Sequence, residues 1–416
     1  MADTPLVADD AAQASGLARC ADGGAVRLDA EPVLAWDQRA LDAIQAESAS
    51  PLIASRALAM ESIAVSAVVD AIDNAPLARV VGPETLEAIS AAAVAAAAHR
   101  VLSDAFPAQS AALDAAFAES LAGVPDGAAE TVAVAFGDAV AETVVALRAG
   151  DGWDAAATYE GATEPGEWRP TPPGYLPALA PQWGSVEPFA LASADQFRPA
   201  GPPDLAGADY TAALDEVERL GSVDSPERTA EQTETALFWS DGAGTYTPPG
   251  HWNEIAAGIA AREGLGAAES ARVLAALNVA LADAGIATWD AKYAYGSWRP
   301  ITAIRLADDD GNAETAADPG WSPLLTTPNH PEYVSGHAAF SAAAATVLTA
   351  LLGDVAFSTT SKAALPGVVR DFDGFADAAA EAGRSRIFAG IHFEFSDGDG
   401  LALGHTVGDW VLDAFR

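Results

Sequence analysis

Hydrophobic positions recur at three- and four-residue intervals through most of this chain, which is the period of an α-helix. Val65, Val68, Val69 and Ile72 follow that spacing within an alanine-rich region from about 51 to 149. Alanine is a good helix former, and low-complexity disorder would not place large apolar side chains at helical intervals. We therefore predict about four helices in this region.

Helical patterns resume after about residue 208, and alternation typical of β-strands is nearly absent. The expected helices are Tyr210–Leu220, Glu227–Trp239, Asn253–Glu263, Ala268–Ala284, Ser335–Leu352, Phe372–Phe388 and Gly400–Phe415. The fold class predicted from this pattern is all-α, with two helical bundles packed together.

Between the two helical regions, residues 163–207 are rich in proline and have no helical period. A flexible linker is one interpretation. Large aromatic side chains are usually buried, however, and this stretch contains Trp168, Tyr175, Trp183, Phe189 and Phe197. We favour an ordered crossover, which divides the chain into an N-terminal bundle (1–162), the crossover (163–207) and a C-terminal bundle (208–416).

The charge balance narrows the range of partners. The 416 residues carry 59 acidic and 21 basic side chains, a net charge of -38, yet half of the chain is apolar. The electrostatic field of so large a negative charge repels nucleic acid and anionic membranes. An acidic surface on an ample core suggests a protein that works in very high salt, where charges are screened over roughly 3 Å at 1 M.

Other features of the sequence bear on compartment. Cys20 is the single cysteine, so no internal disulfide can form. The first residues lack a basic segment followed by an apolar run, and the longest apolar stretch, Ala338–Leu352, is interrupted by hydroxyl side chains. It is shorter than the 18 residues a membrane span needs. We expect a soluble, cytoplasmic protein with no membrane segment; its oligomeric state cannot be read from the sequence.

The first candidate functional segment runs from Lys292 to Pro300 and contains two cations, Lys292 and Arg299. Lysine occurs at only two positions in the chain, 292 and 362. Seven residues on a helix return to nearly the same face, and Pro300 favours a helix end at Arg299. The two cations could simply complement the helix dipole or surface acids. The aromatic side chains around them indicate a more apolar environment, where a cation needs an anionic partner.

The second segment is Ser335-Gly336-His337, just before an apolar helix. Serine is a good N-cap, and the free N–H groups of a helix start attract oxyanions. Gly336 lets the backbone approach a ligand closely, and His337 could exchange a proton with it. A plain serine-capped helix with an incidental histidine would give the same three letters.

The third segment contains Arg386 and His392, separated by Gly390, which can turn the chain so that both face one point. Arginine offers a planar fork for an oxyanion, and histidine offers a nucleophile or ligand. An ordinary helix end with a surface arginine is the alternative. The remaining histidines have no such company and are expected to be structural or exposed: His99, His251, His330 and His405.

Taken together, Lys–six residues–Arg-Pro, Ser-Gly-His and Ser-Arg–five residues–His resemble the three-part motif of one superfamily. It comprises the vanadium-dependent haloperoxidases, the type-2 phosphatidic acid phosphatases and bacterial non-specific acid phosphatases. From about residue 165 onward the chain is similar to the soluble haloperoxidase branch. Two positions depart from the pattern: Val334 stands where the family usually has proline, and Ser396 where the phosphatases commonly have an aspartate.

The resemblance implies an enzyme with vanadate as cofactor, or phosphate in the same site. His392 would bind vanadium, or attack phosphorus in a phosphatase. Lys292, Arg299 and Arg386 would neutralise the equatorial oxygens, with hydrogen bonds from Ser335 and Gly336, and His337 would act as acid–base. Hydrogen peroxide and halide would be the substrates, with Lys292 polarising the peroxide and a small organic acceptor possible. A soluble acid phosphatase and a non-catalytic oxyanion-binding protein are the alternatives.

Overall fold

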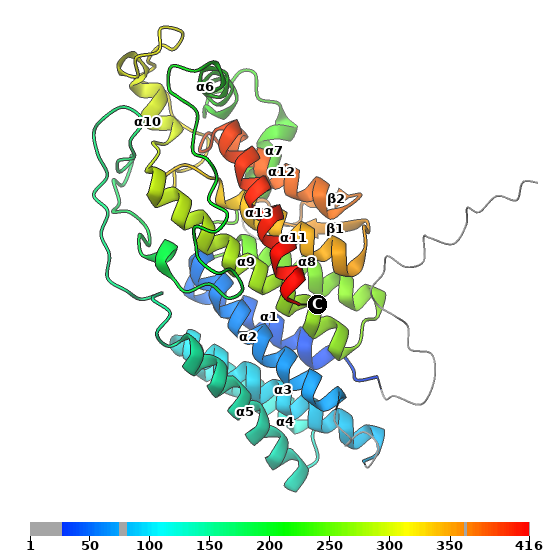
Figure 1. The fold of residues 1–416 in the computed structure, drawn as a ribbon. Helices are drawn as coiled ribbons and strands as arrows, with labels where there is room; N and C mark the ends of the chain where they lie inside the picture. The colour runs from blue at the N-terminus through cyan, green and yellow to red at the C-terminus, as the bar shows by residue number, and fades with distance from the viewer. Residues whose placement is uncertain (1–26, 75–80, 362–363, 416) are drawn as a thin grey trace, which may run out of the picture.

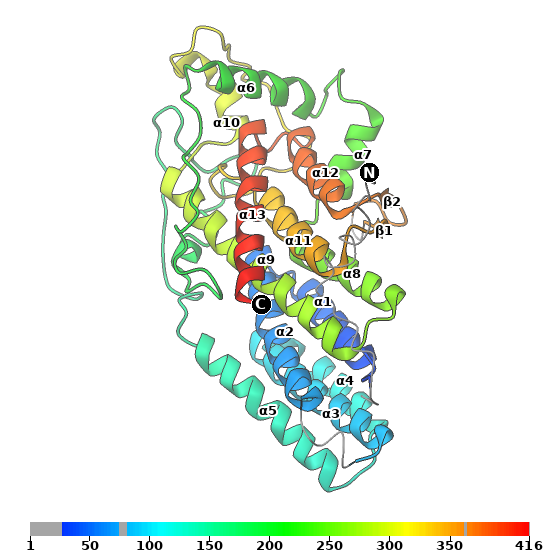
Figure 2. The ribbon, with the colours of Figure 1, turned by 45° about the vertical axis from the view of Figure 1, so that its right-hand side comes forward.

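The computed structural model describes residues 27–74, 81–361 and 364–415 (Figures 1 and 2); Cys20 and Lys362 lie outside them. The α-helices are α1 Glu31–Glu47, α2 Pro51–Asp73, α3 Pro83–Ala105, α4 Ser110–Ala122, α5 Ala128–Arg148, α6 Ala208–Gly221, α7 Ala230–Phe238, α8 Thr247–Glu263, α9 Ala267–Tyr295, α10 Pro300–Arg305, α11 Gly336–Leu352, α12 Phe375–Phe388 and α13 Glu394–Ala414. Short 3-10 helices are η2 Pro107–Gln109, η3 Trp183–Ser185 and η4 Ala307–Asp309. The predicted all-α class is confirmed.

Helix α9 lies at the junction of the fold. It packs against α2 from the N-terminal helices and against α11 and α13 from the C-terminal ones. Apolar residues occupy nearly all of its faces, as expected for a helix surrounded by protein rather than one that lies on a surface. In Figure 2, helices α3–α5 lie below α9, and helices α6, α7 and α12 lie above it.

The N-terminal region contains the expected helices α2–α5 and one more, α1, which the sequence interpretation did not identify. Helix α3 packs against α2 and α5 through an alanine-rich face. Gly137 of α5 shows how close this packing is, because a Cβ there would come within 2.2 Å of the Ala93 carbonyl oxygen. Alanine and glycine in this bundle therefore set the distance between the helices.

Several predicted boundaries in the C-terminal half are wrong. Helix α9 continues to Tyr295, beyond the expected end at residue 284, and α8 begins at Thr247. The helix expected from Phe372 begins at Phe375 instead, and the strand before it was not predicted: β2 (Val369–Phe372) pairs antiparallel with β1 (Phe357–Thr360). Strands this short have too few positions for an alternating pattern to be distinguished from the helical pattern around them.

The crossover region is held on the body of the fold by α9. The buried carboxylate of Asp283 accepts three backbone N–H groups, from Phe189 at 2.7 Å, Ala190 at 2.8 Å and Leu191 at 2.9 Å. Trp168 and Trp183 are buried, whereas Tyr175 is exposed, contrary to the expectation for the aromatic residues of this stretch. The crossover thus bridges the two bundles along a fixed path.

The expectation that no segment could cross a membrane needs correction. Helices α2, α3 and α9 are each long and apolar enough to do so by length and composition. None of the three stands out in the sequence as an unbroken apolar run, because these helices include isolated polar residues. In the fold, the apolar windows of the three helices are 72%, 61% and 94% buried within the protein itself.

Candidate oxyanion site

Lys292 and Arg299 lie close together for a different reason than the one predicted. Helix α9 ends at Tyr295, and Gly296 follows in the left-handed conformation at φ 57°. Pro300 then begins a new helix, α10, with Arg299 as its N-cap residue. The two cations therefore lie on either side of a turn and not on one continuous helix face, and both are fully buried.

The Lys292 ammonium group is surrounded by carbonyl oxygens of the loop before α11. Its Nζ donates to the carbonyl oxygens of Pro331 at 3.1 Å, Glu332 at 2.9 Å and Val334. All three ammonium hydrogens can thus be used, since lysine has three donors and no acceptor. In this structure Lys292 fixes the path of the loop that leads into Ser335.

Arg299 joins two histidines. Its Nη1 is 3.1 Å from Nε2 of His392 and 2.8 Å from the Ile391 carbonyl oxygen, and its Nη2 is 3.0 Å from Nδ1 of His330. A guanidinium group can only donate, so the His392 Nε2 atom must be an unprotonated acceptor. The remaining ring proton of His392 is therefore on Nδ1.

Ser335-Gly336-His337 forms the start of α11, as predicted. Ser335 is the N-cap residue, and its Oγ accepts from the backbone N–H of Ala338 at 3.4 Å. The peptide bond between Tyr333 and Val334, just upstream, is cis. Helix α13 closes over this turn at Gly400, where a Cβ would come within 2.7 Å of the Ser335 carbonyl oxygen.

Arg386 and His392 are brought together by the loop between α12 and α13. Helix α12 ends at Phe388, and Gly390 takes a positive φ of 77°, as the sequence predicted for a chain reversal here. Arg386 donates to the Ser385 Oγ at 2.8 Å and to the Ala236 carbonyl oxygen at 3.0 Å. His392 then faces the same cavity as Arg386.

A cavity of about 400 Å³ opens onto this cluster. Four predicted site residues line it, Gly336, His337, Arg386 and His392, whereas Lys292, Arg299 and Ser335 lie behind the wall. Its remaining walls are mainly apolar, with a few polar groups, and come from both bundles: Pro51, Leu179, Ser240, Asp241, Gly242, Ala243, Pro248, Trp289, Leu325, Thr326, Pro328, His330, Phe340 and Ile391. An apolar enclosure with a few convergent polar groups is typical of a ligand site.

The electrostatic character of the cavity is positive. Burial, and then the charge of Arg299, lowers the pKa of Lys292 well below its ordinary value. Burial lowers the pKa of Arg299 and of Arg386 to about 10 each, and burial with the Arg299 charge lowers that of His392. Each of these changes means that the cationic forms lack sufficient negative charge nearby.

The pKa of His337 is also lowered. Burial, followed by Arg386, lowers its pKa to about 3, although Asp241 opposes the effect. Its Nε2 atom is buried and has no hydrogen-bond partner among the residues that the structure describes. A neutral imidazole with a free nitrogen on a cavity wall is suited to take or give a proton to a bound ligand.

Sequence reasoning missed three residues at this site. His330, expected to be structural or exposed, lines the cavity and is bonded to Arg299. Glu332 is fully buried, and its Oε1 is 2.7 Å from the His392 Nδ1. Asp241 lines the cavity and accepts from the Nδ1 of His251 at 3.1 Å. Burial would raise the pKa of Asp241, but His251, His337 and Arg386 together lower it.

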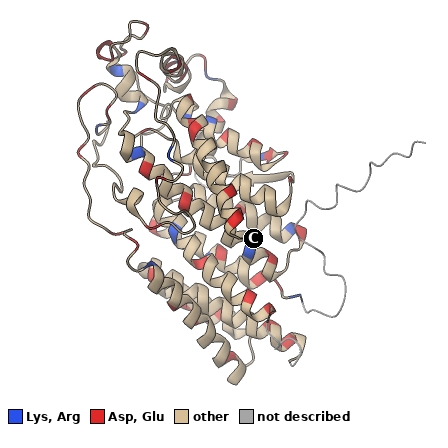
Figure 3. Ribbon diagram, viewed as in Figure 1, with Lys and Arg blue, Asp and Glu red and all other residues tan. Residues whose placement is uncertain are grey.

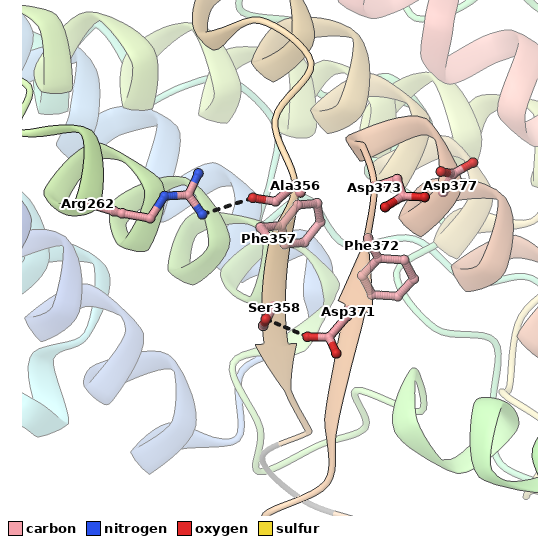
Figure 4. Close-up of a pocket in the computed structure, with 8 residues that line it drawn as sticks. All are labelled: Arg262, Ala356, Phe357, Ser358, Asp371, Phe372, Asp373 and Asp377. Atoms are coloured by element: carbon pink, nitrogen blue, oxygen red, sulfur yellow. Dashed lines mark hydrogen bonds between the residues drawn. The ribbon is translucent and has the colours of Figure 1, made fainter.

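A second cavity, of about 410 Å³, has the opposite character. It lies beside the β1–β2 hairpin and is lined by Asp371, Asp373 and Asp377 together with a single cation, Arg262 (Figure 4). The Arg262 guanidinium group donates to the Ala356 carbonyl oxygen at 2.9 Å. This second cavity contains none of the predicted site residues, and its carboxylates would repel an oxyanion. Of these two cavities, the first is therefore the one that suits an anion.

Comparisons with known proteins agree with this geometry. The family model described as the VCPO second helical-bundle domain matches residues 272–416, which include all three motif segments. A vanadium chloroperoxidase from Curvularia inaequalis is 33% identical over 193 residues, a match that covers 39% of this chain and 31% of that protein. The match thus spans about a third of the length of that relative.

Solved structures extend the likeness to nearly the whole chain. The crystal structure of a bacterial vanadium-dependent iodoperoxidase superposes with a TM-score of 0.76 and 27% identity, covering 94% of this chain and 98% of that one. A bacterial vanadium-dependent chloroperoxidase in its holo form has a TM-score of 0.67 and 18% identity, covering 88% and 92%, and bears on the fold alone. The chain is therefore similar to the vanadium haloperoxidase-like branch of the superfamily, in sequence over residues 272–416 and in fold over nearly its whole length.

Proposed function

We propose that this protein is a vanadate-dependent haloperoxidase, which uses hydrogen peroxide to oxidise a halide to hypohalous acid. The balanced reaction takes up one proton and releases water: H2O2 + X⁻ + H⁺ gives HOX + H2O. The observation that carries the proposal is the set of three buried cations and two histidines around one cavity. The names of the relatives support the peroxidase over the phosphatase.

The charges of the site fit vanadate. Lys292, Arg299 and Arg386 supply three positive charges. Among the acids that act on them, burial raises the pKa of Glu332 and of Asp397 to about 7, so these two are only partly ionised near neutral pH and positive charge is in excess. The unpartnered Nε2 of His337 adds a polar group that a ligand oxygen could meet. A bound oxyanion would satisfy both, since buried charges and polar groups require partners.

Each residue then has a defined task. His392 Nε2, already deprotonated, would hold the vanadium, and vanadate bound there would activate peroxide for oxidation of halide. Arg386 and the Gly336 N–H at the start of α11 would neutralise and hydrogen-bond its oxygens, with Lys292 and Arg299 contributing from behind the cavity wall. His337 would move the proton that the reaction consumes. The apolar walls would limit the water around these charges and so strengthen their effect.

A paired assay on one preparation tests the proposal. One arm supplies orthovanadate, hydrogen peroxide and bromide and follows halogenation of a dione; the other supplies p-nitrophenyl phosphate without vanadate. We expect vanadate-dependent halogenation that is lost in His392→Ala. Phosphate hydrolysis that vanadate only inhibits, with no halogenation, would identify an acid phosphatase. No His392-dependent activity in either arm would leave an oxyanion-binding protein.

A further inference from the structure

The imidazole ring of His392 has a buried carboxylate behind it that comes from the loop before Ser335-Gly336-His337. Glu332 Oε1 lies 2.7 Å from His392 Nδ1 and 3.1 Å from the backbone N of Phe393. Both Glu332 and His392 are almost entirely removed from solvent. Only one other side chain of the described residues is within hydrogen-bond reach of Nδ1, the Ser396 hydroxyl, at the long distance of 3.4 Å.

The two nitrogens of His392 fix its tautomer from opposite sides. Arg299 can only donate, so Nε2 accepts at 3.1 Å and Nδ1 carries the proton. Glu332 is in place to receive that proton as a hydrogen bond, and a carboxylate acceptor makes it a strong one. The Nε2 lone pair is thereby kept free of a proton and accepts from Arg299, and a vanadate group that bound Nε2 would take the place of this hydrogen bond.

We propose that Glu332 is the positioning residue of His392 and replaces a carboxylate that the phosphatases place four residues after the histidine. In this chain Ser396 stands at that position and is too short and too far from Nδ1 to do the same work. The carboxylate reaches the ring instead from the loop that precedes Ser335-Gly336-His337. This inference rests on the proposed binding of an oxyanion at His392, but it does not depend on halide oxidation.

The contact between Glu332 and His392 also links the loop before Ser335 to the segment that contains His392. The backbone carbonyl of Glu332 is held by Lys292 Nζ at 2.9 Å, while its side chain binds the ring and the backbone of the 392–393 segment. A displacement of the loop would therefore alter both the start of α11 and the orientation of His392. Partners that orient a metal-binding histidine in this way typically change metal affinity 10- to 100-fold when removed.

The experiment moves the carboxylate from residue 332 to residue 396. Vanadate dissociation constants are measured by equilibrium dialysis of the apoprotein for wild type, Glu332→Gln, Ser396→Ala, Ser396→Asp and the double variant E332Q/S396D. We expect ~10- to 100-fold weaker binding in Glu332→Gln, at most a few-fold change in Ser396→Ala, and recovery of most of the loss in the double variant. Thermal unfolding midpoints report whether each variant is folded.

The outcomes separate positioning from simple structural support. Binding in Glu332→Gln within threefold of wild type would overturn the proposal. So would a loss in the folded Glu332→Gln protein that Ser396→Asp does not repair, since relocating the carboxylate restores the hydrogen bond to the ring but not the packing around residue 332. If Glu332→Gln fails to fold, Glu332→Asp and the double variant carry the test, with the dialysis constant read in the same way. Because the readout is vanadate binding, an absence of halogenation in the wild type would refute the proposed function and leave this result standing.

Discussion

Asp37 is predicted to make the stability of the N-terminal bundle depend on pH. Its side chain lies on α1, is 1% exposed, and neither carboxylate oxygen has a hydrogen-bond partner within the described part of the chain. Burial raises the pKa of Asp37 from 3.8 to about 7. Glu61 on α2 is also buried, and its pKa is raised by burial and then by Asp37.

The size of the effect follows from linkage. The neutral acid is favoured in the folded state, so the native protein loses stability as pH rises from the unfolded pKa of 3.8 to the folded pKa of about 7, and the loss is complete above that. At 1.36 kcal/mol per pKa unit, this difference corresponds to about 4 kcal/mol. Asn at this position keeps the shape but cannot ionise, so Asp37→Asn should be more stable than wild type by about that amount at pH 8 and little different at pH 4.

Urea unfolding at pH 4, 5.5, 7 and 8.5, in one fixed high concentration of salt, measures this difference. Asp42→Asn is the matched control, because it removes an exposed carboxylate from the same helix and should change the unfolding free energy by no more than about 0.5 kcal/mol. Burial raises the pKa of Glu61 in both proteins, but Asp37→Asn removes the part of the rise that comes from the Asp37 charge. Parallel curves for wild type and Asp37→Asn across this range would refute the reasoning, since they would show that Asp37 has no raised pKa in the folded state.

Three further predictions concern the site. Lys292→Ala should weaken vanadate binding about 10-fold, because it frees the 331–334 loop, and should lower halide oxidation by a further factor of about 100. Equal losses in dialysis and in the halogenation assay would contradict a role of Lys292 in activating peroxide. Gly404→Ala would place a Cβ 2.2 Å from the Ala339 carbonyl oxygen, so a loss of about 1–3 kcal/mol in urea unfolding is expected, and an unchanged value would mean that α11 and α13 can separate freely. Vanadate association, followed by stopped-flow tryptophan fluorescence, should become faster as sodium nitrate is added, because the net charge of -38 repels anions; a slower rate would show local attraction to dominate.

The helical class and the three motif segments could be predicted from the sequence because both depend on local spacing. The turn at Gly390 is an example: a glycine between Arg386 and His392 predicts a reversal, and the positive φ is there. The arrangement of Lys292 and Arg299 shows the limit of this reasoning. A spacing of seven is compatible with one helix, but the capping glycine at 296 ends α9 earlier and Pro300 begins another helix.

The residues that the sequence did not identify are those whose partners are distant along the chain. Glu332 meets His392 across 60 positions, and Asp241 meets His251 across a turn whose backbone the sequence does not specify. His330 stands just upstream of the Ser-Gly-His turn, which was a weak signal of its place in the cavity. The packing of α11 against α9 and α13 joins elements that are far apart along the chain, and local spacing does not specify it.

The distribution of charge raises a question about how an anion reaches this site. Acidic residues are spread over both bundles, whereas basic residues are few (Figure 3), and the three cations of the site are buried. In dilute buffer the outer field opposes entry of vanadate and halide, and the cavity attracts them only at short range. At 1 M salt the outer field is screened within roughly 3 Å, while buried charges are screened much less. High salt would therefore remove the barrier to entry and leave the binding energy, so an acidic surface and an anion-binding interior are compatible if the protein works in concentrated salt.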